Sequence, residues 1–275
     1  MSFRVTRARH ASLLLCLLVL LSACAVVRAP EHTRIALFAP FEGRYREIGY
    51  NALYAARLAL ADAHNESVDL LAVDSGGTEA AHHAKALAQD PLVMAAIVLG
   101  YDSTSADALQ AFGDIPVLVV GDWGAKPIGD HVYILSNPQI DQQITAPSRI
   151  SVIDAATLPS LIVGNDVFAL EGFAKLRTSL DGVTVLSSGT LPDADFTQRY
   201  KAGDQFAPEP GLLATLTYTA TSKAVSALSA GSRTAARNFL VADFSNGYQK
   251  DAQIHRYRYV NGSLTEDVST NDIVK

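Results

Sequence analysis

Short apolar runs alternate with longer amphipathic stretches along the chain from Arg34 onward. An unbroken apolar run predicts a strand that is buried on both faces, and apolar residues recurring every three or four positions predict a helix. In the first half, the predicted strands are 35–40, 68–73, 94–99, 115–120 and 132–135, and the predicted helices are 45–64, 78–89 and 103–112. Apolar strands separated by helices indicate a parallel sheet covered on both faces, with right-handed crossovers, which is a Rossmann-like lobe.

The second half of the chain is less regular. Its predicted strands are 150–153, 160–163 and 183–187, and its predicted helices are 166–180 and 212–230. We expect 196–210 to be irregular, and 239–274 to be strands and turns with a hairpin at Asn261-Gly262. Only residues 154–159 separate the first two strands, whereas a parallel crossover needs about a dozen residues. Either one of these segments is not a strand, or a βα unit is missing here.

The first two dozen residues carry an export signal. Three arginines precede an apolar run that is too short to span a bilayer, and the run ends in Leu21-Ser22-Ala23-Cys24. This ending resembles the lipobox of bacterial lipoproteins, which implies lipidation of Cys24 as the first mature residue. Several acyl chains on one residue give lasting membrane attachment. The alternative is an ordinary signal peptide with an incidental cysteine.

Composition agrees with an extracytoplasmic location. Removal of residues 1–23 takes three arginines and no acid, so the formal net charge moves from −6 to −9. Such a balance argues against nucleic acid as a partner and against polybasic binding to anionic lipid. Cys16 leaves with the signal and Cys24 would carry lipid, so the mature chain has no disulfide.

The chain offers no coherent catalytic constellation. Asp74-Ser75-Gly76 imitates the triplet of aspartic proteases, but no second copy supplies the paired carboxylate. Glu79, His82 and His83 share one predicted helix without a further ligand at suitable spacing. A Gly-x-Ser-x-Gly elbow, a dinucleotide fingerprint and a phosphate loop are all missing from the sequence. We therefore expect a protein that is not an enzyme and that uses no cofactor and no metal.

Several segments resemble a known family in their order along the chain. Residues 35–49, Ile-Ala-Leu-Phe-Ala-Pro-Phe-Glu-Gly-Arg-Tyr-Arg-Glu-Ile-Gly, precede a helix of Ala-Ala-Arg-Leu-Ala-Leu type. Residues 96–100, 196–200 and 256–262 continue the likeness. Together they resemble type I periplasmic substrate-binding proteins, closest to the leucine/isoleucine/valine-binding group of ABC importers. The resemblance implies two α/β lobes with parallel sheets, closing by a hinge around a small ligand.

The resemblance and the general rule for open parallel sheets place the ligand at the same edge. Ligands bind beyond the carboxyl ends of the strands, where loop amides and helix N-termini are unsatisfied. In the family, hydroxyl residues after the third strand hold a ligand carboxylate, and Ser103 or Thr104 matches, with backbone amides near Ser103 as an anion site. The ligand-binding residues predicted in this way are Tyr45, Tyr101, Ser103, Thr104, Asp122 and Trp123.

Asp122-Trp123-Gly124 departs from the amino-acid binders, which usually carry a small residue and a hydroxyl there. An acid would repel a ligand carboxylate and favour an amine, another cation or a sugar hydroxyl, and Trp123 could stack on an apolar or sugar face. The alternative is a solvated turn acid beside an aromatic that packs the lobes. The ligand is therefore expected to be small and polar: amino-acid-like, an amine or a sugar.

The sequence predicts the following organisation: a lipoprotein signal peptide over 1–23, a tether over 24–33, a first lobe over 34–136, a reduced second lobe over 137–205, and a return helix with terminal strands over 206–275. We expect a lipid-anchored solute-binding protein that serves an ABC permease. Ala25 replaces the aspartate that often marks inner-membrane retention, so an outer-membrane location is compatible. The alternative is a regulatory envelope lipoprotein of the same fold that has lost its ligand, such as an activator of cell-wall synthases.

Overall fold

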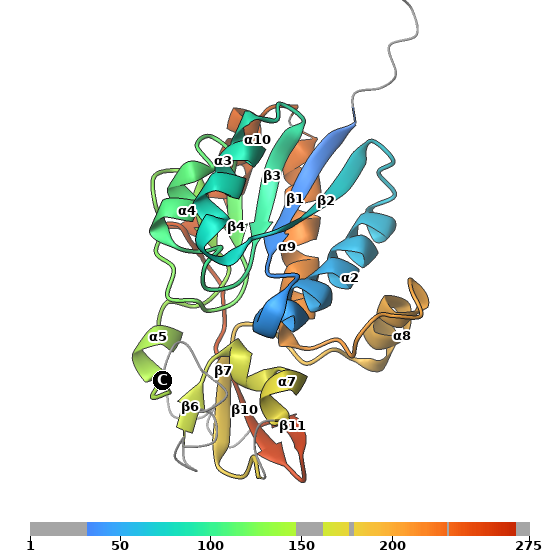
Figure 1. Ribbon diagram of the computed structural model, residues 1–275, viewed down its shortest axis with the longest axis vertical. Helices are drawn as coiled ribbons and strands as arrows, with labels where there is room; N and C mark the ends of the chain where they lie inside the picture. The colour runs from blue at the N-terminus through green and yellow to red at the C-terminus, as the bar shows by residue number, and fades with distance from the viewer. Residues whose placement is uncertain (1–31, 147–161, 176–178, 230, 268–275) are drawn as a thin grey trace, which may run out of the picture. The chain divides into compact units, whose positions relative to one another are not determined.

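The computed structural model describes residues 32–146, 162–175, 179–229 and 231–267. The predicted signal, Cys24 and the predicted strand 150–153 lie outside the described residues. Thr33–Lys275 forms one compact unit, and its strands make two separate sheets (Figure 1). Among the described residues, no helix combines the length and the apolar character needed to cross a bilayer.

The first sheet is mainly parallel, as the unbroken apolar runs predict. Its strand order is β2-β1-β3-β4-β5-β9-β8. The strands are β1 (Thr33–Ala39), β2 (Val68–Asp74), β3 (Val93–Val98), β4 (Val117–Val119), β5 (Val132–Ile134), β8 (Phe244–Ser245) and β9 (Tyr248–Gln249). Every residue of β3, β4 and β5 is buried, because helices cover both faces. Only the β8–β9 pair is antiparallel.

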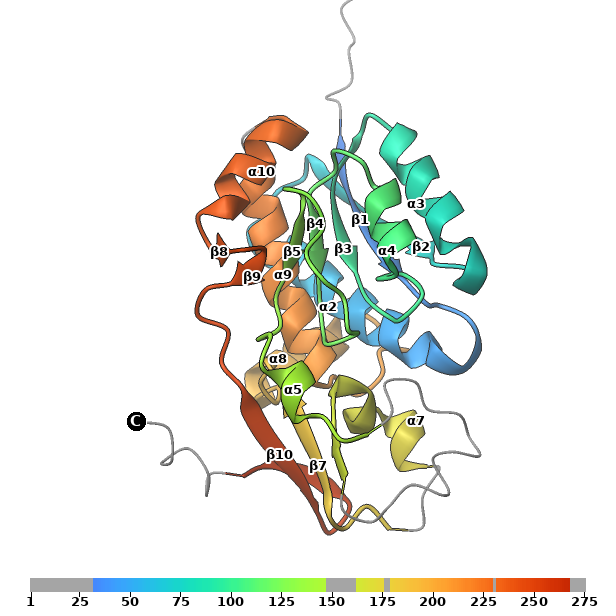
Figure 2. The same cartoon turned by 90° about the vertical axis from the view of Figure 1, so that its left-hand side faces the viewer.

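Amphipathic helices cover the two faces of this sheet. On one face lie α2 (Arg46–Ala63) and α9 (Leu212–Leu228), which pack against each other, and on the other lie α3 (Ala80–Gln89) and α4 (Ala106–Ala111) (Figures 1 and 2). Helix α10 (Arg233–Val241) packs on α9. Alanines and leucines on the inner sides of α2 and α9 are buried, which allows the two helices to approach closely.

The second sheet is smaller and mixed, with strand order β11-β10-β7-β6. Strands β6 (Ile162–Gly164) and β7 (Val183–Ser187) are parallel, whereas β10 (His255–Val260) and β11 (Ser263–Glu266) form an antiparallel hairpin beside β7. The hairpin turns at Asn261 and Gly262, both at positive φ, so the Asn-Gly prediction is confirmed.

Short elements flank the sheets: the 3₁₀ turns η1 (Gly43–Tyr45), η2 (Gly77–Glu79) and η3 (Asp166–Ala169), and the helices α5 (Ile140–Gln143), α7 (Glu171–Ala174) and α8 (Ala194–Ala202).

Three predictions of secondary structure are wrong: one predicted helix is broken, and two helices occur where none was predicted. The helix expected over 166–180 is broken at Leu170, whose backbone is extended, so η3 and α7 replace its first half. The segment 196–210 is not irregular throughout, because Asp193 caps α8 by accepting a hydrogen bond from the Phe196 N–H at 2.7 Å. The expected strands and turns after 239 miss α10, which Ser232 caps in the same way.

The chain passes between the two sheets three times: between β5 and β6, between β7 and α9, and between β9 and β10. Asn137 joins these passages. Its N–H donates to Ser188 Oγ at 2.9 Å, and its side-chain Nδ2 donates to the Ala252 carbonyl at 2.6 Å. This arrangement matches the predicted crossing segments between lobes; the exact lobe boundaries at 136 and 205 stay a prediction.

Gly49 gives a test of how α2 is placed against β1. A Cβ at Gly49 would lie 2.3 Å from the Pro40 carbonyl oxygen, which is backbone and cannot move aside without shifting the loop that follows β1. We expect Gly49→Ala to lower the free energy of unfolding by about 2 kcal/mol, measured by urea denaturation. Gly203→Ala is the control, since its Cβ would meet nothing closer than 3.7 Å. Equal stability of the two variants would contradict this packing.

Candidate functional site

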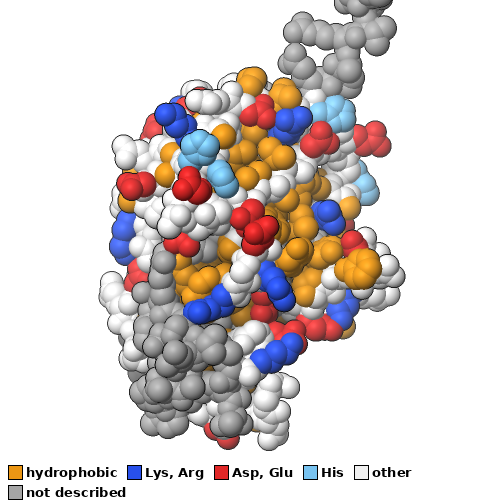
Figure 3. All heavy atoms as spheres, in the orientation of Figure 1, with side chains coloured by type: hydrophobic (Ala, Val, Ile, Leu, Met, Phe, Trp, Pro, Cys, Tyr) orange, Lys and Arg blue, Asp and Glu red, His pale blue; other side chains and the backbone are white. Residues whose placement is uncertain are grey.

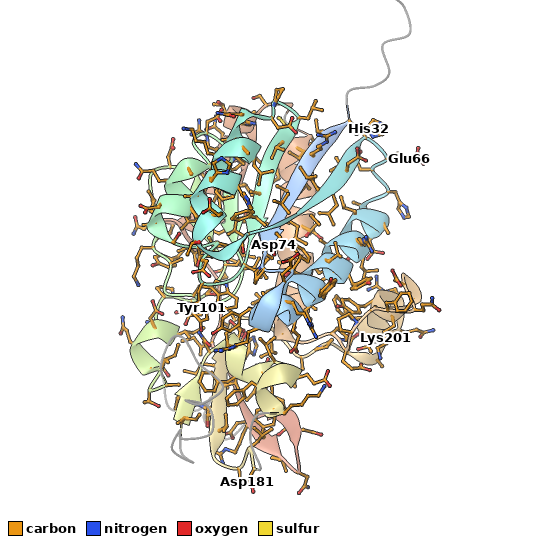
Figure 4. The ribbon with its side chains drawn as sticks, viewed as in Figure 1. His32, Glu66, Asp74, Tyr101, Asp181 and Lys201 are labelled. Atoms are coloured by element: carbon orange, nitrogen blue, oxygen red, sulfur yellow. The ribbon has the colours of Figure 1, made fainter. Side chains whose placement is uncertain are left out.

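The carboxyl ends of neighbouring strands of the first sheet bring the predicted ligand residues together. Tyr101, Ser103 and Thr104 follow β3, and Asp122 and Trp123 follow β4, which is the next strand of the sheet. In Figure 4, Tyr101 lies at the end of the first sheet that faces the second sheet. All five side chains are buried, and Ser103 is 0% exposed. The strand-end rule therefore places these residues at one edge of the sheet.

The two hydroxyls after β3 differ in their partners. Thr104 Oγ1 donates to the Gly100 carbonyl at 2.8 Å, so this hydroxyl serves the turn. Ser103 Oγ has no partner among the described residues. The helix expected from Ser103 begins only at Ala106 with Ser105 as its cap, and the N–H groups of Thr104 and Ser105 are bonded inside the turn. A helix N-terminus at Ser103 is therefore a wrong prediction, and the Ser103 hydroxyl is the group left to meet a ligand.

The loop after β4 is bound to the second sheet through its backbone. The Asp122 N–H donates to Asp166 Oδ2 at 3.1 Å, and the Asp122 carbonyl accepts from Asn165 Nδ2 at 2.7 Å. Asn165 and Asp166 directly follow β6, and the Ser187 hydroxyl at the end of β7 donates to the other oxygen of Asp166. Two hydrogen bonds thus bridge the strand-end loops of the two sheets.

Asp122 is not a solvated turn acid, because its residue is only 7% exposed. Burial raises the pKa of Asp122 to about 8, and the nearby negative carboxyl of Asp141 and a hydrogen bond shared with it add to the shift. Asp141 lies on α5 and pairs with Lys126 at 2.8 Å. Burial also raises the pKa of Asp166, against the hydrogen bonds from Ser187 and the Asp122 N–H, which lower it. Asp122 is therefore largely a neutral acid near pH 7.

Aromatic side chains line the same edge. Tyr45 meets Tyr101 edge-on with ring centroids 5.7 Å apart, and Tyr101 meets Trp123 at 5.1 Å. The Trp123 indole folds back over Gly121 and donates to the Val120 carbonyl at 2.5 Å. Gly121 has φ +85°, and a Cβ there would lie 3.0 Å from the indole nitrogen. Trp123 is thus held as a packed wall, with its N–H already used.

Buried polar atoms without donors or acceptors follow three neighbouring strands. Among the described residues, Ser103 Oγ after β3 and Ser136 Oγ after β5 have no partner. Strand β4 lies between these two strands, and Asp122 Oδ2, which follows it, accepts no hydrogen bond from an N–H or O–H group of the described residues. Its one partner among them is Asp141, through a proton that the two carboxyl groups share. Buried polar atoms are normally hydrogen-bonded, so an orphaned set at one edge indicates a bound molecule or water.

Sequence reasoning missed Ser136 and Asp141, whereas the rule for strand ends already places Asn165 and Asp166 at the ligand edge. Ser136 could have been found, because it comes just after a predicted strand that neighbours β4. Asp141 gave no signal, since its importance rests on contact with Asp122 across the fold.

Two cavities lined by described residues, one of about 220 Å³ at the crossing segments and one of about 650 Å³ between α2 and α7, contain none of the six predicted ligand residues. No described group of three or more His, Cys, Asp or Glu residues has a geometry that could hold a metal ion.

Solved structures share this architecture. The leucine-binding protein LivK from Thermotoga maritima matches with a TM-score of 0.66 and 15% identity over 86% of this chain and 97% of that one. The isoleucine complex of the branched-chain amino acid substrate-binding protein LivJ from Streptococcus pneumoniae matches with a TM-score of 0.62 and 13% identity, covering 86% and 99% of the two chains. A solute-binding protein of an ABC transporter from R. palustris, in complex with benzoate, matches with a TM-score of 0.60 and 13% identity over 85% and 94%.

These likenesses show that the chain has the type I periplasmic-binding fold, as the order of its segments predicts. The neighbours are extracytoplasmic binding proteins of ABC transporters rather than enzymes. No family model matches the sequence, and no curated protein matches it significantly. At this level of identity the comparison defines the class of fold, and the ligand must be argued from the site.

The buried carboxyl of Asp122 predicts a pH dependence of stability. Its pKa is raised from the usual value of about 4 to about 8, so between these pH values the folded chain keeps a proton that the unfolded chain has released. The free energy of unfolding therefore falls as pH rises through this window, by up to about 1.4 kcal/mol per pH unit for one proton. Asp122→Asn should flatten this slope, measured by urea denaturation between pH 5 and 8.

Because the pKa of Asp166 is also raised, the free energy of unfolding of Asp122→Asn still falls with pH, and the slope is flattened only in part. Asp107→Asn, an exposed substitution on α4, is the matched control and should keep the wild-type slope. A wild-type slope in Asp122→Asn would show that Asp122 ionises in the folded protein as it does in the unfolded chain.

Proposed function

We propose that the protein is a lipid-anchored, extracytoplasmic solute-binding protein that captures a small polar ligand between its two sheets and delivers it to an ABC-type importer. It is not an enzyme in this proposal. The observation that carries it is the pair of orphaned buried hydroxyls of Ser103 and Ser136, on either side of the buried Asp122 carboxyl at three neighbouring strand ends that face the second sheet. The printed ligands of two structural neighbours, isoleucine and benzoate, agree with a small-molecule site in this fold.

The protonation state of Asp122 distinguishes how the candidate ligand classes would bind. A neutral carboxyl donates one hydrogen bond and repels a ligand carboxylate less than an ionised one would. A cationic amine would instead draw Asp122 into its charged form and lower its pKa on binding. Both the amine and the amino-acid-like or sugar ligands thus suit the site, and they differ in whether binding releases a proton.

The test is calorimetry with residues 25–275, which contain the whole compact unit that begins at Thr33. Amino acids, polyamines, sugars and nucleosides are titrated in turn, each in two buffers of different ionisation enthalpy. We expect one class to bind tightly at 1:1, and Ser103→Ala to weaken it about tenfold by removing one hydrogen bond to the ligand, a loss of about 1.4 kcal/mol. Ser226→Ala, an exposed serine on α9, is the control and should bind like wild type.

Proton release at pH 7 identifies an amine on Asp122, and its absence identifies a neutral or carboxylate ligand. If Ser103→Ala and Asp122→Asn both leave tight binding unchanged, the ligand binds at another place on the protein. No heat with any ligand class would count against solute capture.

Lipid anchoring at Cys24 is a separate part of the proposal. Expression of the full chain with radiolabelled palmitate should label the wild type, and Cys24→Ala should lose the label and release the protein from membranes. Cys16→Ala is the control, since Cys16 lies in the predicted signal. Absence of label on the wild type would leave the segment an ordinary signal peptide, and labelling that survives Cys24→Ala would place the lipid elsewhere.

A second candidate function is a regulatory envelope lipoprotein that has lost its ligand. The direct hydrogen bonds that the Asp122 N–H donates to Asp166 and that Asn165 donates to the Asp122 carbonyl favour it, because they join the sheets without a solute between them. Trp123 also fills the edge with its own N–H satisfied. A pull-down that recovers cell-wall synthases rather than permease subunits, together with silent calorimetry, would select this function.

A further inference from the structure

A second groove lies where the beginning of α2 meets α7. It holds about 650 Å³ and is lined by η1 with the first turns of α2, by α7 with Lys175, and by Phe206 and Pro208. We call it the α2–α7 groove. None of the residues predicted to bind the solute lines it, and its walls come from both sheets' helices. It is therefore a site separate from the strand-end edge.

The charge that the α2–α7 groove presents is positive. Both oxygens of Glu47 accept hydrogen bonds from the backbone of α7, from the Glu171 N–H at 2.6 Å and the Gly172 N–H at 2.8 Å. Glu171 pairs with Lys175 at 2.6 Å. Glu47 keeps its negative charge, but the basic side chains that line the groove outnumber the acidic ones, and Arg46 forms no ion pair with any described residue.

Arg46 stands at an unfavourable place for a cation. It is the first residue of α2, where the helix macrodipole presents partial positive charge and favours acids. Arg44, which lies two residues earlier, also lines the groove. Figure 3 shows basic side chains gathered on this face around the start of α2 and over α7. Arg46, at a helix N-terminus that disfavours a cation, points to an anionic partner.

Two aromatic side chains are unusually exposed in the same groove. Phe206 is 77% exposed and Tyr50 is 41% exposed, and both belong to the small set of large apolar side chains that the described surface leaves open to solvent. Aromatic and arginine side chains are the types enriched at protein–protein contacts, whereas singly scattered apolar residues need no explanation. Here they occur together.

We propose that the α2–α7 groove binds an acidic peptide segment of a partner protein that also carries an aromatic or proline side chain. The carboxylates would pair with Arg46, and the ring would lie against Phe206 and Tyr50. The chain as a whole is acidic, with a formal net charge of −6, so an acidic segment is repelled elsewhere and attracted here. A segment in this groove touches α2 and α7 at once and stabilises the contact that Glu47 makes between them.

The test uses residues 25–275 without any solute, so it stands apart from the proposed solute capture. Fluorescein-labelled hexapeptides of sequence Glu-Glu-Phe-Pro-Glu-Glu and Lys-Lys-Phe-Pro-Lys-Lys are titrated, and binding is followed by fluorescence anisotropy. We expect only the acidic peptide to bind. Arg46→Glu should weaken it more than tenfold and Phe206→Ala several-fold, and its affinity should fall as salt rises.

Lys85→Glu is the matched charge-reversal control, because Lys85 is exposed on α3 and does not line the groove. It should leave the affinity unchanged, and unfolding curves should show that all variants are folded. Equal binding of the two peptides, absence of binding, or indifference to Arg46→Glu and Phe206→Ala would overturn the proposal. So would sedimentation with phosphatidylglycerol vesicles that depends on Arg46 while the peptide fails, since the groove would then bind a lipid surface.

Discussion

The pair of hydrogen bonds between the Asp122 backbone and the side chains of Asn165 and Asp166 is the contact on which the arrangement of the site depends. It connects the loop after β4 to the segment after β6 and so sets how closely the strand ends of the two sheets approach. Asp166 can make this contact because the Ser187 hydroxyl supports its other oxygen. A side chain this deeply buried is costly unless it is fully bonded, so the three groups act as one unit.

The same closeness explains the electrostatics of the edge. Burial of Asp122, with Asp141 and Asp166 nearby, raises its pKa and so favours the neutral carboxyl, which can donate a hydrogen bond. The neighbouring hydroxyls of Ser103 and Ser136 then complete a polar row against the aromatic wall of Tyr101 and Trp123.

Much of the fold was predictable because it rests on local pattern. The strands β1 to β5 and the helices α2, α3 and α9 follow from apolar periodicity, and the hairpin follows from Asn261-Gly262. The errors have particular causes. Helix α8 is short and mostly polar, with Tyr200 as its one buried residue, and it is held by Tyr200 stacking on Phe196 and meeting Tyr54 on α2, a contact distant in sequence. Helix α4 starts late because the turn after Gly100 uses the N–H groups of Thr104 and Ser105.

The sequence by itself determined the α/β class, the alternation of parallel strands and helices in the first half and the edge at which polar groups gather, since these depend on periodicity and on a general rule for parallel sheets. Only the tertiary structure decided which groups at that edge are already satisfied. Thr104 and Trp123 bond their own turns, Ser103 does not, and Asp122 meets Asp141 and Asp166 from separate elements. Partners and burial of this kind arise from contacts between residues far apart in the chain, which no local pattern encodes.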